Sequence, residues 1–442
     1  MSERVIKRLP AVSGTSGWEA ISRRRFPLRA LDGPVAADWL IIGAGFAGLS
    51  AARRLLELHP ADRIVLLEAG EVAKGTSGRN SGYMIDVPHN LSSGEYSVGS
   101  EAATKSEIAQ NRFAISFAAH AAADYGMSRR TFDPSGKINA AASERGTEMN
   151  AAYARSLGAI GEKHQLLDAR GMREITGSSY YHGGLYTPGA VLIQPADYIR
   201  SLAEGLAGRV DIFEQSPVVR LGRDRGSWTA TSHKGHVTAP KVIVAVNGHI
   251  EDFGHFQGRL MHIFTYASMT APFQAKAGKP SWALLPADPM GATVRQIETD
   301  EGSRIVIRTR FTYDRTIQVT ERRMARIAAE QRKSLDARFP DLSGVPFNYN
   351  WAGRLCLSRN HVAAFGEIEE GLYSACCENG LGTVKSTLAG VMAADLATGT
   401  HSKVLEDYMD QPKPVRLPPE PFAWLGVNAV IRMQELRAGR EG

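Results

Sequence analysis

The sequence is short of cysteine. Its 442 residues include only Cys356, Cys376 and Cys377, and no two of them form a C-x-x-C pair. This number and spacing exclude a disulfide framework and a zinc site built from thiolates, so we expect no metal. They also favour a reducing compartment.

Long apolar runs are missing as well. Neither residues 1–31 nor any later window holds the ~18 uncharged apolar residues of a membrane span. We therefore expect a cytoplasmic protein without stable membrane insertion. The basic run at 23–25 is expected to lie in a solvated arm, and a membrane or transit element is the alternative.

Charge of one sign is in small excess only. Lys and Arg number 52 against 46 Asp and Glu, which leaves a net charge of +6 and gives no indication of a nucleic-acid partner. Apolar residues make up 43% and charged residues 22% of the chain, as in folded globular proteins. The length is enough for two structural units.

The clearest pattern begins at the apolar run 39–42. A helical pattern follows it, and a second apolar run at 64–67 ends at Glu68. Because Glu68 stands 20 residues beyond the last glycine of the turn, strand, turn, helix and acid together predict a dinucleotide-binding βαβ unit. The glycines and the helix N-terminus would meet a pyrophosphate, and the acid would accept from a ribose hydroxyl. The turn is G-x-G-x-x-G, with Gly43, Gly45 and Gly48.

This fingerprint leaves the identity of the dinucleotide open. Glu68 argues against the 2'-phosphate of NADP, but NAD and FAD both fit. The loop 75–82, GTSGRNSG, consists of small residues that allow close backbone approach along an extended cofactor. A plain surface turn is the alternative for this loop.

With these motifs the sequence resembles the FAD-dependent amine and amino-acid oxidases of the D-amino-acid oxidase superfamily. That group includes glycine, sarcosine, pipecolate and gamma-glutamylputrescine oxidases. Four segments carry the resemblance: IIGAGFAGLSAARRL with Glu68, GTSGRNSG, GGLYTPGAVLIQPADYIRSLAEGL, and WAGRLCLSRNHVAAFG followed by GLYSACCENGLGTVKSTLAGVMAADLATG.

The resemblance implies an α/β fold with a glutathione-reductase-like Rossmann FAD domain and an interleaved substrate domain of α+β type with a mixed sheet. The expected divisions are an N-terminal extension at 1–37, an FAD domain at 38–110, 190–250 and 345–400, a substrate domain at 111–189 and 251–344, and a loosely packed C-terminal tail at 401–442.

The resemblance also implies which residues hold FAD. A helix beginning near Gly382 would direct its N-terminus at the flavin and favour the negative charge of the reduced ring. Val218 is equally compatible with simple core packing. The implied cofactor residues are Gly43, Gly45, Phe46, Ala47, Gly48, Glu68, Ala69, Gly78, Arg79, Asn80, Ser81, Val218, Asn247, Gly248, Gly380, Leu381, Gly382 and Thr383.

Two departures from the sarcosine-oxidase pattern matter. Cys356 falls one position away from the cysteine that binds flavin covalently, so we expect non-covalent FAD. Lys385 is one residue late for the lysine that binds a substrate carboxylate, and one residue turns a helical side chain by about 100°. Lys385 is therefore a doubtful ligand.

Residues that contact substrate are expected in the second domain. Arg308 follows an apolar run and would pair with an anionic substrate group, unless it is a solvated arginine at a strand end. Tyr266 and Trp351 are the main aromatic candidates, and Trp282 and Tyr349 are further ones.

The expected reaction is oxidation of a C–N bond in an amine or amino acid, with a secondary amine preferred. The imine is hydrolysed, and molecular oxygen takes the electrons to give hydrogen peroxide. Two alternatives stay open: a dehydrogenase that passes electrons to a quinone or carrier, and a non-catalytic flavoprotein subunit. The oligomeric state is not encoded in any recognisable pattern.

Overall fold

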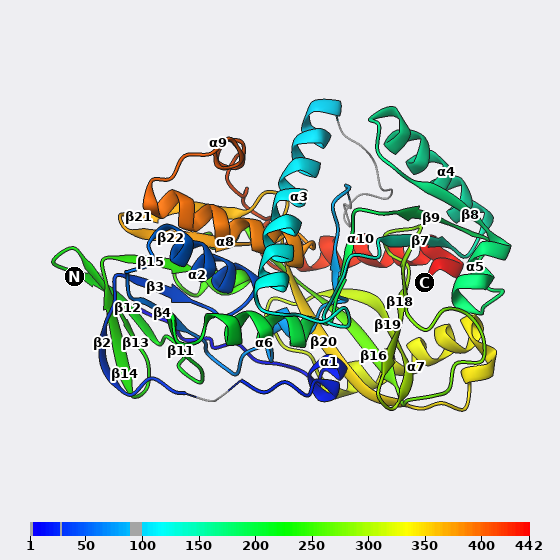
Figure 1. The fold of residues 1–442 in the computed structure, drawn as a ribbon, viewed down its shortest axis with the longest axis horizontal. Coiled ribbons are helices and arrows are strands. Elements are labelled where there is room, and N and C mark those ends of the chain that lie inside the picture. Colours follow the sequence, from blue (N-terminus) through cyan, green and yellow to red (C-terminus); the bar gives the residue numbers. More distant parts are fainter. Residues whose placement is uncertain (1–2, 27–28, 89–99) are drawn as a thin grey trace.

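The computed structural model describes residues 3–26, 29–88 and 100–442. Two large sheets lie beside each other, one flanked by α2 (Phe46–Leu58) and α8 (Gly382–Thr398), the other by α4 (Glu144–Ala159), α5 (Ala169–Thr176), α7 (Glu321–Arg338) and α10 (Phe422–Ala438) (Figure 1). No helix in the described ranges is long and apolar enough to cross a membrane.

The first sheet has six strands, and the predicted βαβ unit is at its centre. All its strands are parallel except β21, which pairs antiparallel with β22. The inner strands are continuous apolar runs because both faces of a parallel sheet are covered. The order is β11 (Val210–Phe213), β4 (Ile64–Leu67), β3 (Trp39–Ile42), β15 (Lys241–Val244), β22 (Leu372–Cys376) and β21 (Ala364–Glu369).

Helices α2 and α8 pack closely on one another over this sheet. A Cβ atom at Gly390 of α8 would come within 2.1 Å of the Ala47 carbonyl oxygen of α2, so only glycine allows this approach. The close packing brings the N-termini of the two helices to the same edge of the sheet. Helices α3 (Glu101–Asp124), α6 (Pro195–Leu206) and α9 (Lys403–Met409) complete this half of the molecule.

The N-terminal segment is part of the fold. Strands β1 and β2 form the two edges of a five-stranded sheet, and α1 (Gly17–Ile21) buries Trp18 completely. The basic run at 23–25 is nevertheless solvated as expected, since Arg23 and Arg25 are exposed and Arg24 is only partly buried. The sheet order is β1 (Glu3–Val5), β12 (Arg220–Asp224), β13 (Ser227–Thr231), β14 (Gly235–Ala239) and β2 (Gly33–Ala36).

The second large sheet has eight strands and is mixed. All its neighbours pair antiparallel except β17 and β7. Its edge strand β20 was expected in the FAD domain but pairs along its length with β16. The order is β20 (Phe347–Ser358), β16 (Leu260–Thr270), β19 (Gly302–Tyr313), β18 (Thr293–Thr299), β17 (Trp282–Pro286), β7 (Lys137–Ala141), β9 (Gly183–Thr187) and β8 (Gln165–Asp168). A separate three-stranded sheet has the order β5 (Tyr83–Met84), β10 (Val191–Ile193) and β6 (Phe132–Asp133).

The C-terminal segment is largely exposed but is held to the eight-stranded sheet at two points. Glu435 of α10 is almost fully buried, pairs with Arg310 at 2.8 Å and accepts a hydrogen bond from the Phe311 amide at 3.0 Å. Near the chain end, Glu441 accepts from the Ala142 amide at 2.8 Å. Two buried carboxylates thus fix this segment to the eight-stranded sheet.

Candidate functional site

One large cavity lies between the carboxyl ends of the parallel strands and the eight-stranded sheet. It encloses about 280 Å³ of space accessible to the centre of a water molecule. Its walls come from the ends of β3, β4, β15 and β22, the loop at 75–82, the starts of α2 and α8, and strands β16, β19 and β20. This is the edge at which open parallel sheets bind ligands.

The three fingerprint glycines have three different reasons to be glycine. Gly43 has φ +108°, and a Cβ there would lie 2.6 Å from the Ala245 oxygen. A Cβ at Gly48 would lie 1.8 Å from the Gly43 oxygen, so Gly48 lets the helix pack on the strand. Gly45 borders the cavity, and a Cβ there would closely approach only Ser77, at 2.6 Å from its Oγ. Gly45 is thus the glycine that leaves space for a ligand.

Helices α2 and α8 point uncapped N-termini at the cavity. Neither has a side chain that accepts from its first amides, and the first residues of both line the cavity. By contrast, α3, α4, α5, α6, α7 and α9 each begin with a capping side chain. Free amides and a positive dipole end favour an anionic or polar ligand.

Glu68 lies where β4 ends and borders the same cavity. Its Oε2 accepts from the Ala44 amide at 2.9 Å and its Oε1 from the Gly70 amide at 3.0 Å. Burial raises the pKa of Glu68, and these amides oppose the rise. Each oxygen keeps a lone pair for another donor, such as a ribose hydroxyl.

Arg79 lies along the cavity, but its guanidinium is occupied by main-chain carbonyls. It donates to Lys74 at 2.8 Å, Ser13 at 3.0 Å, Ala352 at 3.2 Å and Gly14 at 2.6 Å. Arg79 therefore joins the loop, the N-terminal segment and β20, and it presents no free donor fork to a ligand. Its neighbour Asn80 holds the loop through Ser77 and Gly82.

Most of the predicted cofactor residues meet at this cavity. Three do not border it: Gly48, Gly78, whose Cβ would lie 1.8 Å from the Ala73 oxygen, and Gly248, whose Cβ would lie 2.8 Å from the His262 ring. These three serve close packing. The predicted residues that line the cavity are Gly43, Gly45, Phe46, Ala47, Glu68, Ala69, Arg79, Asn80, Ser81, Val218, Asn247, Gly380, Leu381, Gly382 and Thr383.

Arg308 and Trp351 face the cavity from the eight-stranded sheet. Ala267 on β16 pairs with Arg308 on β19 to one side and with Trp351 on β20 to the other. A small residue therefore separates two large ones on neighbouring strands. Arg308 is only 8% exposed, donates to Thr293 and lies 5.0 Å from the centre of the Phe311 ring. Because β19 continues to Tyr313, the alternative of a solvated strand-end arginine is wrong.

The other aromatic candidates are not among the residues that line the cavity. The Tyr266 side chain packs with Ile317 and Ile327, and its hydroxyl bonds to Thr312 at 2.7 Å. A bulge between Thr265 and Tyr266 shifts the register with β19 at this point. Trp282 stacks on Phe339 at 5.6 Å, and Tyr349 packs against the main core. Lys385 pairs with Glu107 at 3.2 Å outside the cavity.

Arg8, His249, Arg354 and Glu378 also line the cavity without being among the predicted site residues, although Arg354 and Glu378 lie within segments that carry the family resemblance. Within the described part of the chain, His249 Nε2, Glu378 Oε2 and one Arg354 nitrogen are buried without a hydrogen-bond partner. Burial lowers the pKa of His249 to about 4 and raises the pKa of Glu378 to about 7. Buried polar atoms need partners, so these point to a polar ligand.

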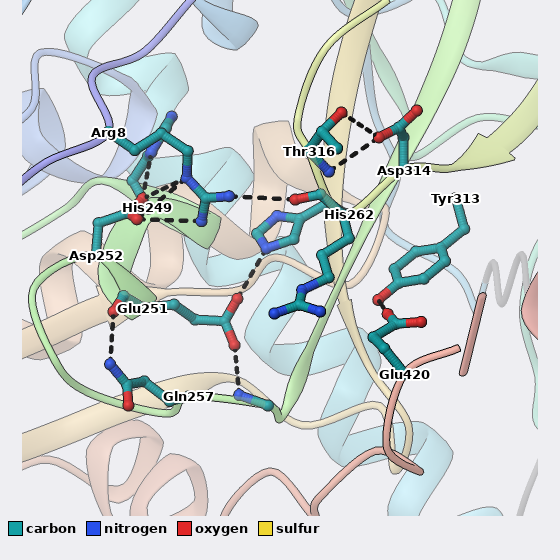
Figure 2. Close-up of polar contacts among 12 residues, drawn as sticks. Arg8, His249, Glu251, Asp252, Gln257, His262, Tyr313, Asp314, Thr316 and Glu420 are labelled. Atoms are coloured by element: carbon teal, nitrogen blue, oxygen red, sulfur yellow. Dashed lines mark hydrogen bonds and ion pairs between the residues drawn. The ribbon is translucent and has the colours of Figure 1, made fainter. Parts of the chain in front are cut away.

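Figure 2 shows how Arg8 and His249 are held. Arg8 donates to Asp252 at 3.1 Å and to the Arg315 carbonyl at 3.1 Å, and His249 Nδ1 lies 2.9 Å from the same aspartate. His249 and Glu378 flank the predicted clusters at 247–248 and 380–383 by one or two residues. This proximity in sequence could have indicated that His249 and Glu378 belong to the site, whereas no neighbouring motif indicates Arg8.

The fold and cavity define a dinucleotide-binding architecture of the glutathione-reductase type. The family described as FAD-dependent oxidoreductase (DAO) matches residues 38–396, and the chain belongs to this family. It is an enzyme family whose members use FAD, and the free helix termini, Glu68 and the unpartnered polar atoms fit that cofactor.

Individual relatives align with this chain over most of its length. The chain is 26% identical over 395 residues to the probable oxidoreductase OrdL of Haemophilus influenzae, covering 83% of this chain and 84% of that protein. It is 25% identical over 398 residues to the gamma-glutamylputrescine oxidoreductase of Escherichia coli K12, covering 87% and 89%. Glycine oxidase from Geobacillus kaustophilus has the same fold, with a TM-score of 0.69, 18% identity, and coverage of 87% and 100%.

Proposed function

We propose that this enzyme oxidises the C–N bond of an amine or amino acid, with a secondary amine preferred. The single observation that carries the proposal is the shared cavity, in which a buried arginine on the eight-stranded sheet faces the uncapped helix termini of the cofactor side. The printed names of two relatives, gamma-glutamylputrescine oxidoreductase and glycine oxidase, support an amine or amino-acid substrate.

In this proposal the six-stranded sheet carries FAD and the eight-stranded sheet carries the substrate. FAD, when bound, supplies the acceptor for a hydride from the carbon beside a neutral amine. Arg308 holds an anionic substrate group, Ala267 leaves room for the substrate, and Trp351 forms a wall. Hydride transfer needs orientation more than it needs an acid or base, so these contacts are the main contribution of the chain.

In the overall reaction, one substrate amine, one molecular oxygen and one water are consumed. One carbonyl compound, one released amine and one hydrogen peroxide are formed. The test is aerobic incubation of the holoenzyme with secondary and primary amino acids and with polyamine derivatives. Peroxide is measured with a coupled peroxidase and the carbonyl product with a hydrazine reagent. Equal amounts of both products support the proposal. Oxidation of substrate without peroxide would contradict the oxygen step.

A second candidate, a dehydrogenase that delivers electrons to a membrane quinone, is favoured by the surface of α10. Phe422, Leu425 and Leu436 are 68%, 54% and 66% exposed, and the same helix carries Arg432, which is 58% exposed and pairs with Glu435 at 3.5 Å. Apolar residues flanked by a cation suit the surface of an anionic bilayer. Sedimentation with anionic vesicles, together with quinone reduction in place of peroxide release, distinguishes this candidate from the oxidase.

A further inference from the structure

The N-terminal segment forms a wall of the cofactor cavity although it lies outside the region that defines the family. The family match begins at residue 38, yet Ile6 and the residues from Arg8 to Ser13 line the cavity. We call the residues Arg8 to Ser13 the N-terminal strap. No glycine fingerprint or family motif assigns a role to it.

The strap is anchored at its two ends. At the first end Arg8 Nε donates a bifurcated hydrogen bond to the two Asp252 oxygens at 3.1 and 3.3 Å, its Nη2 lies 3.1 Å from Asp252 Oδ1, and its Nη1 donates to the Arg315 carbonyl (Figure 2). At the second end the Ser13 carbonyl accepts from the Ala352 amide at 3.0 Å and from Arg79 at 3.0 Å. The second anchor is the same arginine that fixes the loop at 75–82.

Between the anchors, residues 9–12 make no hydrogen bond to any described residue. Leu9 is 37% and Val12 is 51% exposed, while both also line the cavity. The chain here is therefore a single layer between the cavity and solvent. Such a layer opens when one anchor releases, because little else holds it.

The inner surface of the strap is apolar. Leu9, Pro10, Ala11 and Val12 present no charge, whereas the free helix amides that suit a pyrophosphate are at the starts of α2 and α8. An aromatic ring system fits the apolar wall, and a phosphate does not.

We propose that the N-terminal strap is a cofactor-binding element that covers a ring portion of non-covalent FAD and retains it, with the Arg8–Asp252 contact as its latch. FAD leaves after Arg8 releases Asp252 and residues 9–12 swing outward. The proposal depends on the cofactor and not on the proposed substrate, so it is tested without turnover.

The experiment measures the rate of FAD release from purified holoenzyme, from the rise in flavin fluorescence after dilution. Arg8→Ala removes the latch, and replacing Leu9, Pro10, Ala11 and Val12 together by glycine keeps both anchors but removes the apolar wall. Arg23→Ala is the control, because Arg23 pairs with Asp300 at 3.0 Å on the surface and does not line the cavity.

We expect Arg8→Ala to accelerate release roughly tenfold, as for loss of a charged hydrogen bond, with a comparable increase in the glycine variant and none in the control. Since the replaced strap residues are exposed and make no hydrogen bond within the described part of the chain, the glycine variant is expected to fold even if Arg8→Ala does not. Salt should accelerate release in the wild type and not in Arg8→Ala. A release rate within twofold of the control in either variant overturns the proposal.

Discussion

Substitution of Gly45 is expected to affect cofactor binding much more than folding. It is the N-cap of α2 with extended backbone angles, φ −90° and ψ −167°, which valine adopts without strain. A Cβ there closely approaches only Ser77 Oγ, at 2.6 Å, and a hydroxyl can rotate away. We therefore expect Gly45→Val to fold, with a loss of about 1 kcal/mol from the poorer N-cap.

The same valine projects into the space where the pyrophosphate meets the helix amides. Overpacking at the upper end of its usual range, about 3 kcal/mol, weakens FAD binding roughly a hundredfold. The assay is FAD titration of the apoprotein by quenching of flavin fluorescence, with urea unfolding measured in parallel. Gly45→Ala should give a smaller loss of affinity.

Gly48→Ala is the contrasting control, because its Cβ would lie 1.8 Å from a backbone oxygen and the βαβ unit has no room to adjust. Gly48→Ala should therefore reduce the yield of folded protein, and its effect should not be confined to the affinity for FAD. A soluble Gly45→Val protein with wild-type FAD affinity would refute the assignment of the pyrophosphate to this turn.

Three other perturbations address the substrate side, the buried acid Glu378, and the clamp that Arg79 forms on four main-chain carbonyls. Arg308→Lys should weaken substrate binding despite the retained charge, and Arg308→Ala should weaken it by about 1.5 to 3 kcal/mol with normal flavin content. The measurement is the rate of anaerobic flavin reduction as a function of substrate concentration, and an unchanged concentration dependence in both variants contradicts the prediction. Because the pKa of Glu378 is raised to about 7, its contribution to stability is complete below its ordinary pKa of 4.5 and is lost as pH rises to 7. Between pH 4.5 and 7 the FAD-free wild type should therefore lose roughly 3 kcal/mol relative to Glu378→Gln in urea unfolding, and parallel pH profiles would show that Glu378 is not the cause. Arg79→Lys should lower the free energy of unfolding by roughly 3 kcal/mol, since an ammonium cannot serve four carbonyls; a loss below about 1 kcal/mol would contradict the clamp.

The sequence predicts the local part of the cofactor site well. Strands at 39–42 and 64–67 and a helix after Gly45 were expected, and β3, β4 and α2 occupy those places. The pattern is sufficient there because strand, turn and helix are adjacent in the chain. The family and its FAD dependence, expected from four dispersed motifs, are confirmed by the match to residues 38–396.

The substrate side was predictable only in part, because it is built from pairing between distant strands. The face of the sheet on which the Tyr266 side chain lies depends on a bulge after Thr265. A register shift of one residue moves a side chain to the other face of a sheet. Arg8 reaches the cavity from an edge segment 244 residues before its partner Asp252. No local pattern encodes such a contact.

The central claim is that substrate C–N bonds deliver electrons to FAD in this cavity. It is tested most directly by mixing the holoenzyme, without oxygen, with matched pairs of an amino acid and the 2-hydroxy acid of the same skeleton, and by following the flavin absorbance. Our account predicts bleaching by the amine member of a pair, fastest for secondary amines, with recovery of a carbonyl product. Bleaching by the hydroxy acids alone would contradict it.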